Sequence, residues 1–251
     1  HPAMKLPPLA FVVAIALTQS LVAADASPSS PSDRMLAEYF RAETRAVTRP
    51  EQARTAVFYS ISNCQEGLRG ISFGNLLIKH VAEDLKAQYP HLKSFATLSP
   101  IPGLRRYVDD KLKTEGDAAL TAGEVDSLVS VLDEARGAAA VRKLLDRPNW
   151  PEVPAVDKAL KAILTRMAAN YLTSTDEKGR ALDRVAHFHL GNGAIVERLN
   201  WQGDMSANGL KQSYGMMVNY RYKLSDVDAN HEAYATGKVV ASREVRTAAK
   251  G

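Results

Sequence analysis

The sequence predicts a single α/β domain of the α+β kind, in which a mixed central sheet is flanked by helices. Short runs rich in β-branched and aromatic residues, at 56–61, 93–98 and 216–224, are typical of strands. Apolar residues at helical spacing occur between them, most extensively over 104–172. The 251 residues are 45% hydrophobic and 24% charged, a balance that suits a globular protein with a substantial core.

The charge balance and the single cysteine exclude several classes of protein. With 32 Lys and Arg against 28 Asp and Glu, the net charge is +4, too small for a dedicated nucleic-acid binder. A local site for an anionic ligand remains compatible with it. Cys64 stands alone, which excludes an intrachain disulfide and a cysteine-rich metal site and suits a reducing compartment. Because the net charge is so small, we expect no nucleic-acid partner.

The first part of the chain allows two interpretations. Because the chain begins at His1 rather than at methionine, we expect it to be a piece of something longer. The apolar run Leu9–Val22 ends in small residues, which is typical of a secretory signal. The alternative is a buried opening strand within residues 1–17, since short β-branched runs also fill central strands. Thr18 begins a polar interruption, so no membrane span is expected, and residues 18–54 are predicted to be an irregular linker.

A glycine-rich loop is the first candidate site. Within segment 55–110, residues 56–61 are predicted to be a strand and 75–85 a helix, with glycines 67, 70 and 74 between them. Glycines let the backbone approach a ligand closely, and free N–H groups at a helix start suit phosphate oxygens. The loop is therefore a phosphate cradle or a plain connecting turn. It matches neither the Walker loop nor Gly-x-Gly-x-x-Gly, which disfavours nucleotide hydrolysis and nicotinamide chemistry.

Ser99 is the second candidate, because it stands at the end of a predicted strand. Residues 93–98 form that strand, and Pro100 and Pro102 fix an extended turn after it. The ligand crevice of an α/β sheet opens at the carboxyl ends of strands, which favours a functional role for Ser99. The alternative is a hydroxyl that only satisfies turn backbone. No Gly-x-Ser-x-Gly elbow surrounds it, so a hydrolase nucleophile is not indicated.

Residues 111–180 are predicted to be a helical insertion between Ser99 and the histidines that follow. Thr121 and Glu124 have the spacing of a capping box. Apolar residues recur at helical spacing from Val156 to Tyr171, a stripe that is more typical of core packing than of a cofactor site.

Two histidines form the third candidate. Val185–Leu190 leads through a glycine turn at 191–193 into a second run at 194–201, so we expect a hairpin in which His187 and His189 share a face. Such a pair could hold a metal, but no third ligand stands at a recognisable spacing. We therefore expect no metal site and favour one catalytic histidine.

The rest of segment 181–251 is expected to contain one more strand and a helix. The strand, 216–224, places Tyr220 and Tyr222 on one face. Such tyrosines are packing residues in most proteins, and a hydrogen-bond donor role is the alternative.

Several motifs resemble those of known families. The run Arg69–Gly74 is similar to the pyrophosphate-binding loop of the GNAT acyltransferase fold, with Ser72 where that pattern has a glycine. From about Thr55 to Leu224, the chain resembles the catalytic domain of malonyl-CoA decarboxylases, although residues 18–50 depart from that family. The resemblance implies a GNAT-like mixed sheet. The motifs that carry it are Phe58–Ser62, Gln65–Asn75, Ser94–Gly103, Val185–Ala194 and Gly215–Tyr222.

The resemblance also implies the site residues. The family's serine and histidine dyad falls on Ser99 and His189, and we expect Asn192 and Tyr222 to support it. The family's coenzyme A loop falls on Arg69, Gly70, Ile71, Ser72, Phe73, Gly74 and Asn75.

The implied activity is decarboxylation of malonyl-CoA to acetyl-CoA and carbon dioxide in fatty-acid or malonate metabolism. His189 is then the proton donor, and Ser99 the proton acceptor and carboxylate orienter. No cofactor is expected beyond the coenzyme A of the substrate, because the thioester is its own electron sink. The alternatives are a GNAT-type acyl-CoA-dependent N-acyltransferase and a catalytically inactive coenzyme A-binding domain.

The resemblance bears on assembly and compartment as well. The family's N-terminal helical domain is absent from these residues, and we expect a homo-oligomer where that domain is present. We expect a cytoplasmic protein, or one of the mitochondrial matrix or peroxisome in a eukaryote. Secretion, from the signal-like N-terminal run, is the alternative.

Overall fold

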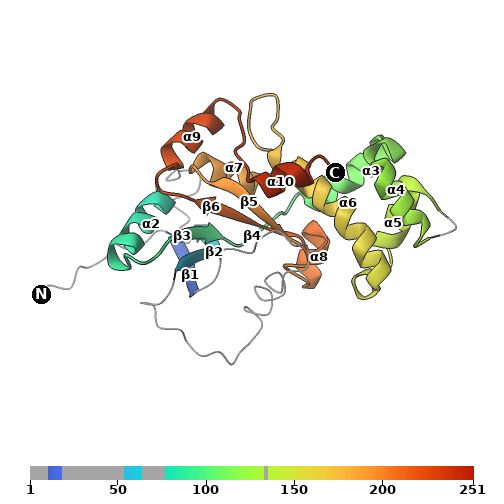
Figure 1. Cartoon of the computed structure of the whole chain (residues 1–251), viewed down its shortest axis with the longest axis horizontal. Helices are drawn as coiled ribbons and strands as arrows, with labels where there is room; N and C mark the ends of the chain where they lie inside the picture. Colours follow the sequence, from blue (N-terminus) through green and yellow to red (C-terminus); the bar gives the residue numbers. More distant parts are fainter. Residues whose placement is uncertain (1–10, 19–53, 64–76, 133–134) are drawn as a thin grey trace, which may run out of the picture.

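The computed structural model describes residues 11–18, 54–63, 77–132 and 135–251, and within these ranges a six-stranded mixed sheet forms the centre of the fold (Figure 1). The strands pair in the order β1-β2-β3-β6-β4, and β5 pairs with β6. β2 and β3 run parallel, whereas the other pairs are antiparallel. The predicted mixed sheet is thus confirmed. The strands are β1 (Phe11–Thr18), β2 (Thr55–Asn63), β3 (Ser94–Thr97), β4 (Ser99–Pro100), β5 (Ile195–Asn200) and β6 (Met217–Tyr222).

The apolar run near the N-terminus forms β1. This strand pairs with β2, with Leu17 opposite Ala56 and Thr18 opposite Thr55. The strand interpretation of the run is therefore confirmed for residues 11–18. The expected linker lies outside the described residues, apart from Thr18 and Arg54 at its two ends.

β3 and β4 are two pieces of one interrupted strand that lies along β6. β3 pairs with the end of β6 and β4 with its beginning. At the interruption, the Leu98 N–H donates to the Phe58 carbonyl of β2 at 3.0 Å. This hydrogen bond ties the chain to β2 immediately before Ser99, the first residue of β4.

The helices α3 to α6 gather at one end of the sheet, on the right in Figure 1, with the short 3₁₀ turns η3 and η4 between them. They run over almost the whole range predicted to be helical. Helix α3 crosses residues 110 and 111, where the sequence suggested that the helical insertion begins. Their bounds are α3 (Leu104–Thr114), η3 (Gly116–Ala119), α4 (Ala122–Val129), α5 (Gly137–Leu145), η4 (Trp150–Glu152) and α6 (Pro154–Thr173).

The remaining helices lie around the sheet (Figure 1). The predicted helix after the glycine loop is confirmed as α2, and the C-terminal segment holds four helices where the sequence suggested one. Their bounds are α2 (Leu77–Gln88), α7 (Arg184–Gly191), α8 (Ala207–Ser213), α9 (Val227–Ala235) and α10 (Arg243–Ala248).

The predicted hairpin around the histidines is wrong. Residues 184–191 form helix α7, and only the second run of that prediction is a strand, β5. Asp183 begins the helix, because its carboxylate accepts hydrogen bonds from the N–H groups of Val185 and Ala186, each at 2.9 Å. In a helix, residues two positions apart point about 200° apart, so His187 and His189 do not share a face.

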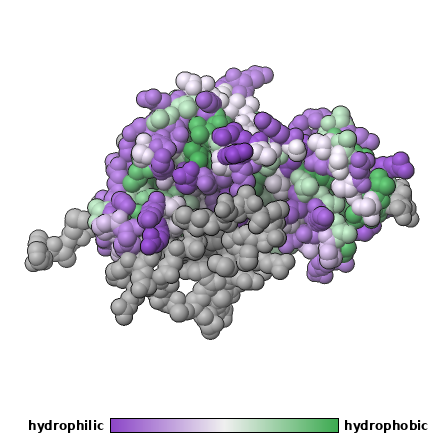
Figure 2. Space-filling view, in the orientation of Figure 1, coloured by the Kyte–Doolittle hydropathy of each residue, from purple (hydrophilic) through white to green (hydrophobic). Residues whose placement is uncertain are grey.

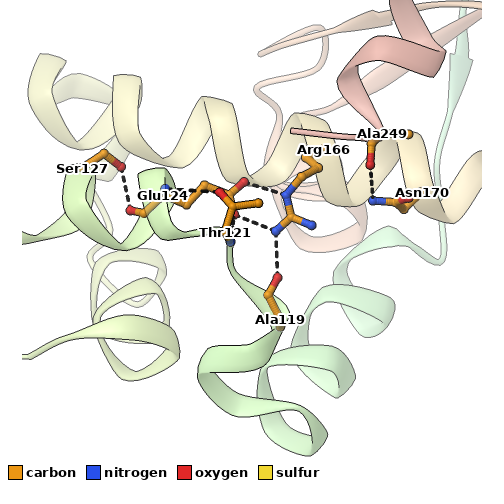
Figure 3. Close-up of polar contacts among 7 residues, drawn as sticks. All are labelled: Ala119, Thr121, Glu124, Ser127, Arg166, Asn170 and Ala249. Carbon is orange, nitrogen blue, oxygen red and sulfur yellow. Dashed lines mark hydrogen bonds and ion pairs between the residues drawn. The ribbon is translucent and has the colours of Figure 1, made fainter.

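A polar network joins the helices of the insertion. Figure 3 shows Arg166 of α6 reaching the start of α4, where its guanidinium donates to both carboxylate oxygens of Glu124 at 2.7 Å. The same guanidinium donates to the Ala119 carbonyl. Thr121 and Glu124 complete the predicted capping box, which is confirmed. Asn170, one turn further along α6, donates to the carbonyl of Ala249, so the C-terminal residues pack on this helix.

The face drawn in Figure 2 is mostly hydrophilic, with apolar residues in small groups. Over the described residues, Val129 and Leu182 are the large apolar side chains that are exposed. One continuous hydrophobic core joins the sheet to the helices of the insertion. Over the same residues, no helix has the length and apolar character needed to cross a membrane.

Candidate active site

Ser99 and His189 meet in the interior of the protein. The Ser99 Oγ and the His189 Nε2 are 3.3 Å apart, although the two residues are separated by 90 positions in the chain. Their exposed fractions are 5% and 3%. The sequence singled out both residues, and the structure brings them together.

The broken strand and the turn after it position Ser99. β4 pairs with β6, which fixes the Ser99 backbone, and Ile101 beyond it is fully buried. Gly103 completes the turn against α6: a Cβ built there would lie 2.1 Å from the Tyr171 hydroxyl oxygen. A side chain at position 103 would therefore require the Tyr171 ring or the turn itself to shift.

Helix α7 positions His189. Ala186, His189 and Leu190 are its buried residues, at the spacing of one helical face. Asn192 ends the helix, because its side-chain amide donates to the Phe188 carbonyl at 2.7 Å. The histidine is thus fixed between a helix start at Asp183 and a helix end at Asn192.

Three aromatic rings surround the imidazole. The Tyr222 hydroxyl lies 2.8 Å from His189 Nδ1. The Tyr220 ring stacks on the imidazole, with centroids 4.5 Å apart and planes at 24°, and Phe188 meets it edge-on. Tyr222 therefore has a polar contact with the site, the alternative that the sequence left open, whereas Tyr220 packs on the ring.

Burial controls the protonation of the site. Because the imidazole is fully desolvated, its pKa falls from 6.5 to about 3, so His189 is neutral at neutral pH. Burial likewise raises the pKa of the Tyr222 phenol well above its usual value of 10, so that hydroxyl keeps its proton. Ser99, His189 and Tyr222 thus form a chain of neutral hydrogen-bonding groups.

Thr97 belongs to this chain, and the sequence analysis missed it. The Ser99 Oγ lies 2.9 Å from Thr97 Oγ1, within hydrogen-bond distance, and Thr97 is fully buried. A signal was available: residues two positions apart in a strand lie on one face, so Thr97 was bound to accompany Ser99.

The remaining candidates from the sequence analysis are His187, Asn192 and the coenzyme A loop at 69–75. His187 is exposed, and its Nδ1 lies 2.6 Å from the Tyr234 hydroxyl, away from Ser99. Asn192 Oδ1 is buried without a hydrogen-bond partner among the described residues. The coenzyme A loop expected at 69–75 lies outside the described residues. Within the described ranges, no group of three His, Cys, Asp or Glu side chains is placed to hold a metal ion.

The fold and the site define a class: an α/β protein in which a serine of the mixed sheet and a histidine of a neighbouring helix form a buried pair suited to proton transfer. Over residues 1–251 the chain matches the family model described as malonyl-CoA decarboxylase C-terminal domain, and it belongs to that family.

Relatives named malonyl-CoA decarboxylase are similar over most of the chain. The mitochondrial malonyl-CoA decarboxylase of Anser anser anser is 40% identical over 200 residues, which are 78% of this chain and 40% of the relative. The mitochondrial malonyl-CoA decarboxylase of Rattus norvegicus is 38% identical over 194 residues, 75% of this chain and 39% of the relative.

Solved structures of proteins named malonyl-CoA decarboxylase are also similar to this chain. The crystal structure of malonyl-CoA decarboxylase from Rhodopseudomonas palustris matches with a TM-score of 0.76 and 39% identity, covering 95% of this chain and 49% of that one. The protein of the same name from Agrobacterium vitis matches with a TM-score of 0.74 and 43% identity, covering 95% and 53%. The chain therefore spans about half the length of these proteins, or less.

Proposed function

We propose that the protein carrying this chain decarboxylates malonyl-CoA to acetyl-CoA and carbon dioxide. The observation that carries the proposal is the contact between Ser99 and His189, 3.3 Å apart in a chain of this family. The name shared by the goose, rat and bacterial relatives supplies the substrate.

The reaction needs little beyond orientation and a proton. The bond between the carboxylate carbon and the methylene carbon breaks, carbon dioxide leaves, and the electron pair stays on the methylene carbon as a thioester enolate. One proton added to that carbon gives acetyl-CoA. Because the thioester accommodates the charge, the chemistry calls for no metal or organic cofactor.

His189 is proposed to supply the proton. Its pKa is low in the free protein because of burial. A malonyl carboxylate held beside the ring introduces a negative charge at short range, which favours the imidazolium. In the imidazolium both nitrogens donate, Nδ1–H to the Tyr222 oxygen and Nε2–H toward Ser99 and the substrate carbon. The proton then moves from Nε2 to carbon and leaves a neutral imidazole with its remaining proton on Nδ1, and this ring gains a proton at Nε2 for the next turnover.

Ser99 is proposed to orient the substrate. Its hydroxyl is close enough to His189 Nε2 to hydrogen-bond the malonyl carboxylate or the thioester oxygen while the histidine faces the same atoms. Ser99 is the acceptor of the pair in that its oxygen accepts the hydrogen bond from His189 Nε2–H, while the one proton transferred goes to carbon. Tyr222 holds the ring orientation through Nδ1. We propose that residues 69–75 hold the coenzyme A pyrophosphate.

Two variants test the assignment. Ser99→Ala and His189→Gln should each reduce turnover about 100-fold or more, because each removes a group that acts on the reacting atoms. The assay measures carbon dioxide and acetyl-CoA from malonyl-CoA in the protein that carries this chain. Full activity in both variants would reject the assignment.

The same assay separates the other two functions. An N-acyltransferase would consume malonyl-CoA only when an amine is present, and would release free coenzyme A. An inactive coenzyme A-binding domain would bind the substrate and change it in neither tube. Acetyl-CoA in the amine-free tube is the result that supports decarboxylation.

The wider setting is proposed on the same basis. The goose and rat relatives are named mitochondrial, and we propose the matrix for a eukaryotic protein and the cytoplasm for a bacterial one. We also propose that the full protein forms a homo-oligomer through a region that corresponds to the part of the relatives not covered by this chain.

A further inference from the structure

Thr97 makes hydrogen bonds in three directions at the break between β3 and β4. Its Oγ1 lies 2.9 Å from the Ser99 Oγ and accepts the backbone N–H of Tyr220 at 3.1 Å. Its carbonyl accepts from the Asn219 side-chain amide, and the Asn219 Oδ1 accepts in turn from Asn200 at 2.8 Å. Thr97 is thus held between the serine and two consecutive residues of β6.

These contacts define the orientation of the Thr97 side chain. Threonine has few χ1 rotamers, and here the hydroxyl is further tied to a main-chain N–H of β6. The Oγ1 acceptor is therefore preorganised, and full burial leaves no water to compete for it. In the free protein the Ser99 hydroxyl hydrogen therefore has an acceptor in Thr97 Oγ1, and a malonyl oxygen takes over that hydrogen bond when substrate binds.

The direction of this hydrogen bond propagates to His189. If the Ser99 hydroxyl donates to Thr97, the Ser99 oxygen can only accept from His189 Nε2. A neutral imidazole carries a single N–H, so Nδ1 must then accept from the Tyr222 hydroxyl. The opposite direction, with Ser99 donating to Nε2, would place the imidazole proton on Nδ1.

We propose that Thr97 is a positioning residue that fixes the direction of the Ser99–His189 hydrogen bond and holds the imidazole proton on Nε2. The inference rests on the proposed function for its consequence in catalysis. Nε2 is the nitrogen that faces Ser99, so the resting tautomer already carries the proton that the imidazolium, formed once substrate is bound, transfers to the substrate carbon. Thr97 touches no substrate atom in this scheme and acts only through Ser99.

The tautomer itself can be measured without any assay of activity. Nitrogen-15 NMR of histidine-labelled protein distinguishes the two neutral tautomers, and the His189 signals are identified by their loss in His189→Gln. The wild-type protein should show the proton on Nε2. A proton on Nδ1 in the wild type would overturn the proposal, whatever the kinetics show.

Two substitutions at position 97 separate the hydroxyl from the shape of the side chain. Thr97→Val keeps the β-branched shape and removes the acceptor, so the Ser99 hydroxyl turns to Nε2 and the Nδ1–H tautomer becomes the major form. We expect kcat to fall by at least about tenfold, with KM within about threefold of the wild type. Thr97→Ser restores the acceptor and should keep both the tautomer and kcat, within about threefold.

Thr55→Val is the matched control. Thr55 is also a fully buried threonine of the same sheet, but its hydroxyl has no hydrogen-bond partner among the described residues. This variant should leave the tautomer and kcat unchanged. Equal losses of kcat in Thr97→Val and Thr55→Val would overturn the proposal, because they would show only a response to altered packing.

The outcomes also separate this inference from the proposed function. Loss of turnover in Ser99→Ala together with full turnover in Thr97→Val would overturn the role of Thr97 and leave the dyad standing. Full turnover in Ser99→Ala and His189→Gln would reject the dyad, while the tautomer would still report on Thr97. If Thr97→Val does not fold, the wild-type spectrum and Thr97→Ser still decide the question.

Discussion

At the scale of single residues, the site combines one titratable ring with partners that are neutral. His189 has lost its contact with water, and Ser99, Tyr222 and Tyr220 surround it without offering a negative charge. The uncharged imidazole is therefore favoured strongly over the imidazolium in the free protein. This property makes the stability of the protein depend on pH.

We predict that His189 destabilises the protein as the pH falls. Its folded-state pKa of about 3 lies below the unfolded value of 6.5, so between these values the unfolded chain binds more protons. Stability therefore declines as the pH falls through this window. Between pH 7 and pH 5, the His189 contribution to the free energy of unfolding should decline by about 2 kcal/mol.

Urea unfolding of the wild type and of His189→Gln at both pH values checks this. The variant keeps every other titratable group, so the difference between the two pH dependences belongs to His189. Identical dependences in the two proteins would contradict the low pKa.

A second prediction concerns the Tyr222 hydroxyl. Tyr222→Phe removes the group that contacts His189 Nδ1 and leaves the ring in place, so the imidazole loses its orientation. We expect kcat to fall about 10-fold to 100-fold with little change in KM, measured by acetyl-CoA formation.

Tyr234→Phe is the control for that variant. The Tyr234 hydroxyl contacts Nδ1 of the exposed His187 and accepts from the Ala181 N–H, so its loss should lower stability but leave kcat unchanged. Equal kinetic effects in the two variants would show that the Tyr222 hydroxyl has no special part in the reaction.

At the scale of elements, α7 shows how far the sequence could be interpreted. The strands β2, β3, β5 and β6 followed from runs of apolar, β-branched and aromatic residues, and α2, the capping box and the core stripe of α6 followed from residue spacing; the structure confirms them. The hairpin was wrong because the glycine turn at 191–193 was taken as decisive. The buried spacing of Ala186, His189 and Leu190 and the cap at Asp183 indicate a helix instead. The likeness to the GNAT fold stays a prediction.

The meeting of Ser99 and His189 could not come from local patterns. It depends on the pairing of β4 with β6 and on the docking of α7, both of which join segments distant in the chain. The position at a strand end made Ser99 a candidate, and the resemblance paired it with His189. Thr97 needed only the two-residue period of a strand, applied to the serine already chosen.

We predict that Asp183 links the stability of α7 to turnover. Asp183→Ala removes the acceptor for two N–H groups at the helix start and should cost about 1 to 2 kcal/mol of stability. Because His189 lies on the same helix, kcat should fall about tenfold as well. Asp183→Asn keeps an acceptor oxygen and should preserve both properties.

The cap of α10 provides the comparison for Asp183. Ser242 Oγ accepts from the Val245 N–H, and α10 carries no residue of the site. Ser242→Ala should lower stability by a similar amount, measured by thermal unfolding, and leave kcat unchanged. A tenfold loss of kcat in Ser242→Ala would show that turnover reports general destabilisation.

At the scale of the whole molecule, the helical insertion and the sheet form one packed unit. The Trp201 indole, just beyond β5, donates to Asp157 of α6 at 2.9 Å, and the Tyr171 hydroxyl of α6 lies against Gly103. Helix α6 therefore contacts both the sheet and the turn that follows Ser99. Within this helix group, the ion pair between Arg166 and Glu124 joins α6 to α4.

We predict that breaking this ion pair costs more stability than breaking an exposed one. The Arg166 and Glu124 side chains are only 14% and 8% exposed, so Arg166→Met leaves a buried carboxylate without its partner. We expect a loss of about 3 kcal/mol in the free energy of unfolding, measured with urea. Arg166→Met combined with Glu124→Gln should recover part of this loss, since the double variant no longer buries an unpaired carboxylate.

Arg180→Met sets the scale for that measurement, because Arg180 is 56% exposed and its pair with Asp176 is solvated. That variant should lose less than about 1 kcal/mol. Arg166 and Tyr171 lie close together on α6, so turnover provides a further constraint. Folded Arg166→Met should keep kcat within about threefold if the ion pair acts on stability alone. Equal stability losses in Arg166→Met and Arg180→Met would show that burial of the Arg166 pair has no energetic consequence.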